Sequence, residues 1–499
     1  MTERLMQRAL LATIIAVVSL SCSPNRETEF FTGRVDFPVQ PNLGVKEAMA
    51  ARVVPHQRQL EWQKLEMTAF IHFTINTFTD MEWGTGKESP ELFNPMSLDA
   101  DQWVRVLSGA GMKMVIITAK HHDGFCLWPT KTTSHSVASS PWKEGKGDVI
   151  RELKDACDRH NMKFGIYLSP WDRNAACYGD SPAYNRFYME QLTELLTWYG
   201  KVDEVWFDGA NGEGPDGRRQ EYDWQAYYDL IRKLQPDAVT AIMGEDVRWV
   251  GTESGYGRET EWSATVLAPG GTPESVAINE ALGIDAMSDD LGSSSLLSRA
   301  EHLFWYPAEV DVSIRPGWFW HASEDSLVKD VEKLADIYLS SVGRNAVLLL
   351  NVPPDNRGLI TDHDIKSLQG LKAWIDDLYS TDMLNGARPY GQGASNLIDG
   401  DNSTSWSPHR KRVASFVPAI AATFNTAMLQ EDISRGQRVE KFVIEALSGE
   451  RWDTIARGTT IGYRRLLRFP EVKADEIRLT IVSSRATPHI STFALYNAR

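Results

Sequence analysis

The sequence predicts an α/β protein with two parts, a (β/α)8 or TIM barrel followed by a C-terminal β-sandwich. Three observations support this fold class: six short apolar runs, amphipathic stretches between them, and a change of texture after about residue 375. Continuous apolar strands that alternate with helices are typical of a parallel sheet covered on both faces. The chain of 499 residues is long enough for a barrel and one smaller domain.

The apolar runs are the expected barrel strands. They are residues 67–73, 112–119, 162–169, 202–208, 237–243 and 344–352, and the expected helices include residues 100–111, 148–161 and 224–235. Room for two more strands between Met243 and Arg344 makes an eightfold barrel the best architecture. A doubly wound open sheet is the alternative.

Residues 379–499 contain turn-rich segments and short alternating runs, such as KFVIEAL and EIRLTIVSS, which predict the β-sandwich. We therefore expect the barrel over residues 55–378 and an N-terminal linker over residues 23–54.

Residues 1–22 have the layout of a secretion signal. Arg4 and Arg8 precede an apolar stretch, Ala9 to Leu20, that is too short to span a bilayer. The pattern resembles a bacterial lipoprotein signal with Cys22 as the lipidated residue, and a plain cleaved signal is the alternative. We expect an exported protein, either periplasmic or an outer-membrane lipoprotein of a bacterium, whose only membrane contact is the lipid anchor.

Composition favours a neutral ligand. A formal net charge of -15 argues against nucleic acid as a partner, and the 17 tryptophans suit sugars, whose C–H faces pack on indole rings. Cys126, Cys157 and Cys177 have no metal-type spacing, and a disulfide between Cys157 and Cys177 is an open alternative.

Residues capable of chemistry follow four of the predicted strands. His72 follows the first, His121 and His122 the second, Tyr167 lies at the end of the third, and Asp208 ends the fourth. Because catalytic residues of a (β/α)8 barrel lie at the carboxyl ends of the strands, we expect these five side chains to meet.

Asp208 can be interpreted as a helix cap or as a carboxylate that attacks or stabilises a cation at the barrel mouth. The second interpretation needs another carboxyl group. The candidates are Glu245, Asp246, Glu253, Glu259 and Glu261. Glu253 is favoured because its glycine-bounded loop contains Trp249 and Tyr256, an apolar setting that would raise its pKa toward that of a general acid.

The adjacent residues His121 and His122 admit three interpretations: metal binding, hydrogen bonding to substrate hydroxyls, or a structural role. No HExxH-type ligand set accompanies them, so we favour hydroxyl binding and expect no required cofactor.

Four motifs resemble the retaining α-L-fucosidases of glycoside hydrolase family 29. They are FIHFTINTF with EWGTG, ITAKHHDGFCLW, GIYLSPWDRN and EVWFDGA, in this order over roughly residues 55–355. The resemblance implies a catalytic β/α barrel, often incomplete or irregular. It also implies release of terminal fucose from fucosylated oligosaccharides or glycoconjugates by double displacement without a metal.

The resemblance also implies roles for individual residues. Asp208 matches the nucleophile, and fucose contacts are implied for His72, Glu82, Trp83, His121, His122, Tyr167, Trp206 and Trp320. The segment RWVGTESG resembles the acid/base loop of the subgroup restricted to α-1,3 and α-1,4 linkages in branched Lewis-type glycans, which favours Glu253.

The segment NLIDGDNSTSWSP is similar to the discoidin-like sandwich. There, Asp399, Asp401 and Thr404 fall where that fold often holds a structural calcium ion. Whether the sandwich binds sugar or only packs on the barrel stays open. Two alternatives to the fucosidase are a non-catalytic surface glycan-binding lipoprotein and a related barrel glycosidase for another sugar. A metal hydrolase is a third.

Overall fold

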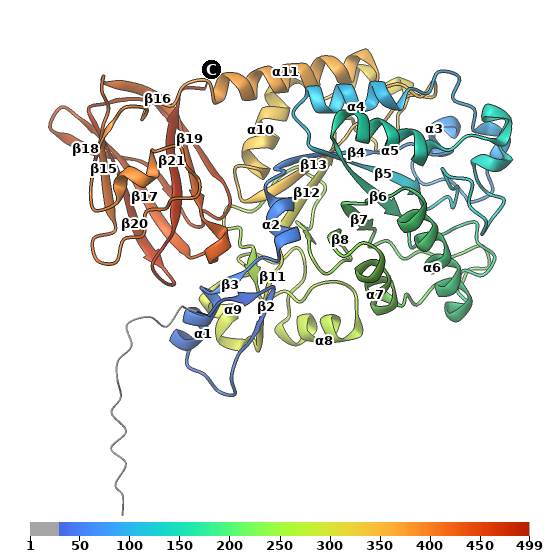
Figure 1. The fold of residues 1–499 in the computed structure, drawn as a ribbon, viewed down its shortest axis with the longest axis horizontal. Coiled ribbons are helices and arrows are strands. Elements are labelled where there is room, and N and C mark those ends of the chain that lie inside the picture. Colours follow the sequence, from blue (N-terminus) through green and yellow to red (C-terminus); the bar gives the residue numbers. More distant parts are fainter. Residues whose placement is uncertain (1–28, 499) are drawn as a thin grey trace, which may run out of the picture.

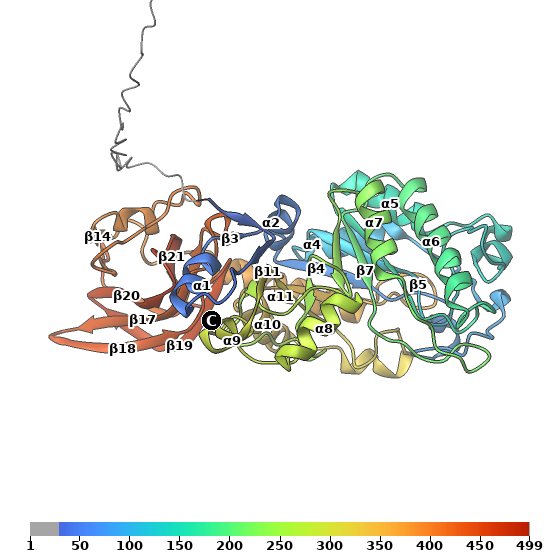
Figure 2. The ribbon, with the colours of Figure 1, turned by 90° about the horizontal axis from the view of Figure 1, so that it is seen from below.

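A computed structural model describes residues 29–498 as an elongated molecule, with an α/β barrel at one end and a β-sandwich at the other (Figures 1 and 2). The predicted signal with Cys22 lies outside these residues. Within residues 29–498, none of the helices has both the length and the apolar character needed to span a bilayer.

The barrel wall is one sheet of eight parallel strands in the order β8-β7-β6-β5-β4-β13-β12-β9. The strands are β4 (Met67–Ile71), β5 (Met114–Lys120), β6 (Lys163–Leu168), β7 (Glu204–Phe207), β8 (Val239–Ile242), β9 (Arg248–Trp249), β12 (Ala308–Ser313) and β13 (Ala346–Asn351). All six predicted runs form strands of this sheet, so the predicted fold class is confirmed. The two strands that the sequence left open are β9 and β12.

Helices cover the outside of the barrel: α4 (Ala100–Gly109), α5 (Val149–His160), α6 (Ser181–Trp198), α7 (Trp224–Leu234), α10 (Val331–Ser341) and α11 (Asp362–Leu378). An aspartate begins most of them by accepting a first-turn backbone N–H; Asp148, for example, accepts from Arg151. Between strands and helices lies the main apolar core, which includes Val205 and Phe207 of β7.

The barrel interior has a separate core. It includes Trp62, Phe70, Met114, Ile116, Tyr167, Trp206, Val239, Val347 and Leu349. Side chains alternate along a strand, so Glu204 and Asp208 share the inward face of β7 with Trp206. This alternation explains why a buried strand ends in a carboxylate: the position after Phe207 projects into the barrel mouth.

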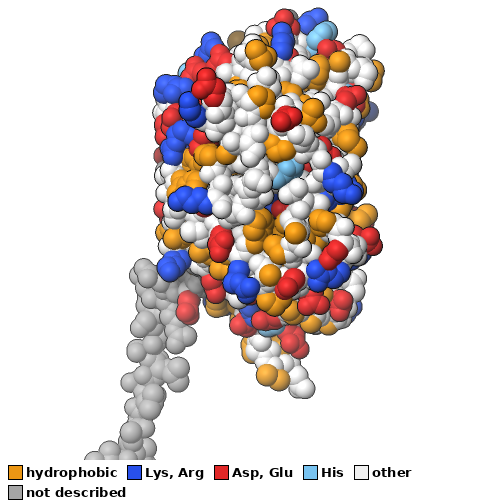
Figure 3. Space-filling model, turned by 90° about the vertical axis from the view of Figure 1, so that its right-hand side faces the viewer, with side chains coloured by type: hydrophobic (Ala, Val, Ile, Leu, Met, Phe, Trp, Pro, Cys, Tyr) orange, Lys and Arg blue, Asp and Glu red, His pale blue; other side chains and the backbone are white. Residues whose placement is uncertain are grey.

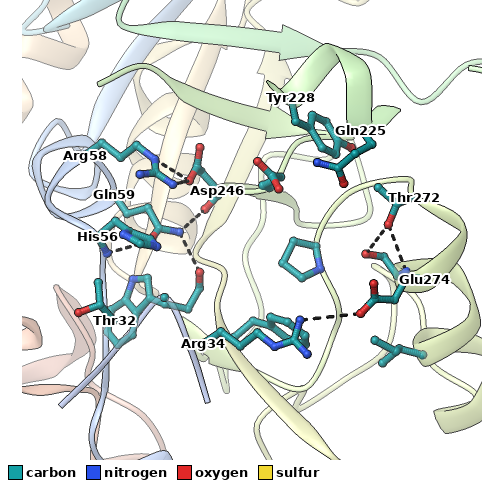
Figure 4. A pocket seen from close by; sticks show the side chains of 17 residues that line it. Thr32, Arg34, His56, Arg58, Gln59, Gln225, Tyr228, Asp246, Thr272 and Glu274 are labelled. Atoms are coloured by element: carbon teal, nitrogen blue, oxygen red, sulfur yellow. Dashed lines mark hydrogen bonds and ion pairs between the residues drawn. The ribbon is translucent and has the colours of Figure 1, made fainter. Parts of the chain in front are cut away.

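The barrel closes along a seam between β8 and β9, where one bridge joins Ala241 and Val247. The turn between the two strands carries Asp246, which is 1% exposed and accepts from the backbone N–H of Thr240 at 2.9 Å. Its carboxylate also pairs with Arg58 at 2.8 Å (Figure 4). A second ion pair joins it to Arg232. We call these contacts the seam latch. A cavity of about 300 Å³ lies beside it, and its two arginines, Arg34 and Arg58, are both paired with carboxylates.

The chain between β9 and β12 replaces a regular barrel helix. It forms β10 (Ala264–Thr265), α8 (Pro273–Leu282), α9 (Ser294–Arg299) and β11 (His302–Trp305).

The segment predicted as a linker differs from that prediction. It contains β1 (Phe31–Thr32), β2 (Arg34–Asp36), α1 (Leu43–Ala50) and β3 (Val53–Val54), and β2 pairs with β11. Residues 31–54 are held against the barrel because apolar residues such as Val35 and Val53 are buried with the β11 segment.

The sandwich has two antiparallel sheets, ordered β14-β15-β20-β17-β18 and β19-β16-β21. Its strands are β14 (Arg388–Tyr390), β15 (Val413–Val417), β16 (Ala422–Glu431), β17 (Val439–Ser448), β18 (Arg451–Gly458), β19 (Arg465–Ala474), β20 (Glu476–Ser484) and β21 (Ile490–Tyr496). Its core is separate from the barrel cores and includes Phe416, Phe424, Phe442 and Phe493.

Polar side chains join the sandwich to the barrel. Gln437 accepts from the backbone N–H of Ser263 at 2.7 Å and donates to the carbonyl of Glu261 at 2.9 Å. Thr460 accepts from the Glu261 N–H at 3.0 Å. Because the Glu261 carboxylate pairs with buried Arg248, the sandwich holds the base of the loop that carries Glu253.

The three cysteines within residues 29–498 are free thiols: Cys126 and Cys157 are buried, and Cys177 is partly buried, so the alternative of a Cys157–Cys177 disulfide is not realised. On the barrel end of the molecule, acidic, basic and apolar side chains are interspersed (Figure 3).

Candidate active site

The carboxyl ends of β4 to β7 bring together the five residues predicted to meet. The ring centroids of His72 and His121 are 5.6 Å apart, and those of His121 and His122 are 4.1 Å apart. Tyr167 stacks on His121 at 5.6 Å and donates its hydroxyl to Asp208 Oδ2 at 3.0 Å. The predicted cluster is therefore formed.

Two donors hold Asp208. Tyr167 bonds one carboxylate oxygen, and the backbone N–H of Ala210 donates to the other at 2.7 Å. Asp208 thus closes a short turn instead of capping a helix. Its carboxylate is 24% exposed, and His122 Nε2 lies 3.8 Å from Oδ2. Both oxygens are restrained, yet the group stays open to a ligand.

The three histidines of the site, His72, His121 and His122, are neutral, and hydrogen bonds at Nδ1 fix the protonation of two of them. Burial lowers the pKa of His72 to about 3, and it lowers the pKa of His121 and His122 as well. His72 Nδ1 lies 2.8 Å from Asn351 Oδ1, an oxygen that only accepts, so Nδ1 carries the hydrogen. His122 Nδ1 bonds Ser169 in the same way at 2.7 Å. The Nε2 atoms of both rings are consequently acceptors for a donor such as a sugar hydroxyl.

Asp208 and Glu253 line one cavity of about 540 Å³, together with Trp206, Trp249 and Asp311. Of the five candidate carboxylates, only Glu253 lines this cavity. The others contact arginines: Glu245 and Asp246 contact Arg232, Glu259 contacts Arg344, and Glu261 contacts Arg248.

The predicted apolar setting of Glu253 is wrong. Glu253 is exposed, and its one side-chain partner is the indole N–H of Trp318 at 3.2 Å. Tyr256 donates to Asp336 at 2.6 Å, and the Trp249 indole donates to Asp311. The two aromatic rings expected beside Glu253 therefore have other hydrogen-bond partners.

The segment PGWFW places Trp318, and not Trp320, among the site residues. The Trp318 ring lies 5.0 Å from His72, whereas the Trp320 indole donates to Asp325 at 3.3 Å. In an irregular loop, side chains do not alternate at a fixed spacing, so the motif alone does not show whether Trp318 or Trp320 points into the site.

Glu82 and Trp83 lie at the rim. Glu82 accepts from the backbone N–H groups of Trp318 and Phe319 at 2.9 and 3.2 Å, and it contacts His321. It therefore fixes the loop that presents Trp318. Trp83 is 56% exposed, with its ring 6.0 Å from that of His122.

Sequence reasoning missed two acidic residues of β12, Glu309 and Asp311. Asp311 lines the cavity, and burial, reinforced by the charges of Glu253 and Asp208, raises its pKa to about 7. The signal was present in the segment AEVDVS, where acidic residues alternate with valines inside a buried strand.

The predicted calcium residues form a hydrogen-bonded turn in the sandwich. Thr404 donates to Asp399 Oδ2 at 2.7 Å, and Asp399 Oδ1 accepts from the Asp401 N–H at 2.9 Å. Over residues 29–498, no group of three or more His, Cys, Asp or Glu side chains is arranged to hold a metal ion. Calcium binding at Asp399, Asp401 and Thr404 stays a prediction.

Comparison with known proteins identifies the family. Residues 46–378, which include the barrel and every candidate catalytic and fucose-binding residue, match the family described as Alpha-L-fucosidase. The chain belongs to the alpha-L-fucosidase family. It is therefore a glycoside hydrolase of family 29, and its substrates contain fucose.

Relatives of this family align over most of the chain. Alpha-L-fucosidase 1 of Arabidopsis thaliana is 41% identical over 89% of this chain and 87% of its own length. The crystal structure of an alpha-L-fucosidase candidate from Bacteroides ovatus superposes with a TM-score of 0.89 at 55% identity, covering 95% of this chain and 79% of that chain. A Ruminococcus gnavus family 29 fucosidase in complex with fucose has a TM-score of 0.79 at 31% identity, covering 90% and 95%.

Proposed function

We propose that the protein is an exo-acting, retaining α-L-fucosidase that removes terminal α-1,3- or α-1,4-linked fucose from branched Lewis-type glycans. The observation that carries this proposal is the shared cavity, because Asp208 and Glu253 are the nucleophile and acid/base predicted from sequence and both line it. A retaining mechanism needs two such carboxyl groups on opposite sides of one glycosidic bond, roughly 5 to 5.5 Å apart.

In the first step, an Asp208 oxygen attacks the anomeric carbon of fucose and forms a covalent ester. The glycosidic C–O bond breaks, and Glu253 gives its proton to the departing oxygen. Tyr167 and the Ala210 N–H hold the Asp208 carboxylate in line for attack. The Nε2 atoms of neutral His72 and His122 accept hydrogen bonds from sugar hydroxyls.

In the second step, Glu253 takes a proton from water, and the resulting nucleophile attacks the anomeric carbon. The ester bond to Asp208 breaks, which frees fucose with its original configuration and restores both carboxyl groups. Because Glu253 is exposed, water reaches it directly.

Two features support a branched glycan as the substrate. Glu253 lies in RWVGTESG, the segment that resembles the acid/base loop of the linkage-restricted subgroup. The cavity that contains Asp208 and Glu253 is also lined by Asn279 and Glu280 of α8, so it offers polar groups to further sugars of a branched glycan.

The test is mass spectrometry of sugars released from a Lewis-type trisaccharide, 2′-fucosyllactose and 4-nitrophenyl α-L-fucoside. Fucose from the trisaccharide alone is the expected result. Release from all three would contradict the linkage restriction, and release of another sugar would contradict the substrate. NMR of the first-formed anomer tests retention: initial appearance of the β-anomer would contradict double displacement.

We also propose that the protein is exported as a lipoprotein through Cys22. Arg4 and Arg8, the apolar stretch and the small residues before Cys22 support this proposal. Incorporation of a palmitate analogue that is lost in Cys22→Ala is the expected result. Equal labelling of both proteins would contradict it.

A further inference from the structure

Two tryptophans line the cavity that contains Asp208 and Glu253, and both are held from the same strand. The Trp206 indole donates to Glu309 Oε1 at 2.8 Å, and the Trp249 indole donates to Asp311 Oδ1 at 2.8 Å. Glu309 and Asp311 are two residues apart on β12, so both face the barrel interior. Glu309 is 0% exposed and Asp311 is 3% exposed.

The orientation of Trp206 affects the neighbours of Asp208. Its ring lies 5.1 Å from Phe70 and 5.2 Å from Tyr167, the residue whose hydroxyl holds the Asp208 carboxylate. The indole N–H is its only polar side-chain group, so the bond to Glu309 is the one hydrogen bond that this side chain can donate.

A second buried carboxyl group explains how Glu309 can lie inside the barrel. Glu204 accepts from the Trp62 indole at 2.8 Å, whereas Glu204 Oε1 and Glu309 Oε2 are buried without a partner. Burial raises the pKa of Glu204 to about 8, and burial with the charge of Glu204 raises that of Glu309 well above its usual range. Both shifts favour the protonated, uncharged carboxyl group, which removes a costly buried charge.

We propose that Glu309 and Asp311 are positioning residues, which fix the Trp206 and Trp249 indoles in the orientation that binds the glycoside beside Asp208. This inference rests on the proposed function to the extent that sugar occupies the cavity lined by Asp208 and Glu253. It assigns a role to two acidic groups that do not themselves exchange protons with the substrate.

The test compares substitutions that remove the acceptor with substitutions that keep it. Glu309→Leu leaves the buried Trp206 indole N–H unpaired, and Asp311→Leu does the same to the partly buried Trp249 indole. We expect each variant to raise KM for the fucosyl substrate about tenfold or more, with a smaller change in kcat. Glu309→Gln and Asp311→Asn keep an accepting oxygen and should stay within about threefold of the parent KM. The change in tryptophan fluorescence on adding fucose should be lost in the leucine variants and kept in the amide variants.

A matched control separates this effect from general destabilisation. Glu194 on α6 accepts from the buried Trp128 indole, also at 2.8 Å, but neither residue lines the cavity. Glu194→Leu should lower the melting temperature and leave KM unchanged. An equal rise of KM in Glu194→Leu would overturn the proposal, as would amide variants that lose as much as the leucine variants.

A double variant covers the case in which Glu309→Leu does not fold. Removing both donor and acceptor, as Trp206→Phe with Glu309→Leu, leaves no unpaired indole and should restore folding, because apolar replacement of both partners can be nearly neutral. If this double variant did not fold, the proposed role of the hydrogen bond between Trp206 and Glu309 would be overturned. Fucose binding can be followed by fluorescence without turnover. If Asp208→Ala stayed active, the proposed nucleophile would be wrong, but fucose binding by the Glu309 and Asp311 variants would still test the positioning role.

Discussion

The two halves of the barrel differ in regularity, and each supplies a different part of the site. From β4 to β7, short strands alternate with α4, α5 and α6, and the histidines, Tyr167 and Asp208 follow the strand ends. Between β8 and β12, the two-residue strands β9 and β10, the helices α8 and α9 and the four-residue strand β11 replace the regular pattern. This seam half carries Glu253 and Asp311.

The regular half of the barrel carries the residue that must be held rigidly, and the irregular half carries the residue that must be accessible to solvent and to the departing sugar. Asp208 is partly buried and restrained by two hydrogen bonds at the end of a continuous strand, whereas Glu253 is exposed on a loop. A nucleophile must meet one carbon atom, and a regular strand end holds it rigidly. An acid/base group must serve both the departing sugar and incoming water, for which an exposed loop is suited.

The largest predicted effect tests this division directly. Asp208→Ala should lower turnover by about 10⁴-fold, and Glu253→Gln should lower turnover of a Lewis-type trisaccharide by about 10²- to 10⁴-fold. Fucosyl fluoride, whose leaving group needs no proton, should remain a substrate for Glu253→Gln when azide replaces water. Azide should then give α-fucosyl azide with Glu253→Gln and β-fucosyl azide with Asp208→Ala, read by NMR. The opposite products would exchange the two roles.

The next effect concerns the stability of the seam. Asp246→Ala leaves Arg58 and Arg232 without their buried partner and should lower the free energy of unfolding by about 3 to 5 kcal/mol. In the regular half, Asp203 pairs with Lys163 and Lys201 at 3.2 and 3.0 Å and is 14% exposed. Asp203→Ala should therefore cost only about 1 kcal/mol. Equal losses in urea unfolding would show that the seam needs no special latch.

A smaller effect should appear in the pH dependence of stability. Burial raises the folded pKa of Asp311 from 3.8 to about 7, so the folded state holds a proton that the unfolded state has already released. This contribution is fully present below about pH 4 and is lost as pH rises to about 7, by about 1 kcal/mol per pH unit. Asp311→Asn stays neutral and should lack this slope. Parallel slopes for the two proteins, measured by urea unfolding, would contradict the shift.

The smallest expected effect is that of chelation. Two carboxyl groups suffice for the proposed chemistry, and in the pair of His121 and His122, Nδ1 of His122 is already hydrogen-bonded to Ser169. Fucose release from the trisaccharide should therefore be unchanged after treatment with EDTA. Loss of activity that added metal restores would favour the metal interpretation of the histidine pair.

The regular half of the fold could be predicted from sequence because each strand is an apolar run followed by an amphipathic helix. The strand β9 could not, because two residues carry no period, and β12 was hidden because acidic groups interrupt its apolar pattern. The N-terminal strands are short as well, and their pairing with β11 joins segments far apart in the sequence. Such pairings depend on tertiary contacts.

The same limit, that regular strands can be predicted and tertiary contacts cannot, explains which site residues could be predicted from the sequence. His72, His121, His122, Tyr167 and Asp208 were predictable because each lies at or beside the end of a recognisable strand. Trp318 was not distinguished from Trp320, because loop geometry decides which ring turns inward. The carboxyl candidates after β8 could be separated only by their partners, since an arginine contacts each of them except Glu253.

The polar contact between sandwich and barrel has a consequence for cooperativity. Gln437 and Thr460 satisfy the backbone groups of Glu261 and Ser263, and these groups are buried at the base of the Glu253 loop. If the sandwich unfolded alone, these groups would lose their partners, so local melting of one part raises the free energy of the other. The two parts should therefore unfold in one transition. A barrel shortened to end near residue 378 should be less stable, because it would lose these partners and also Met428, Leu466 and Tyr496, sandwich residues that pack in the main barrel core.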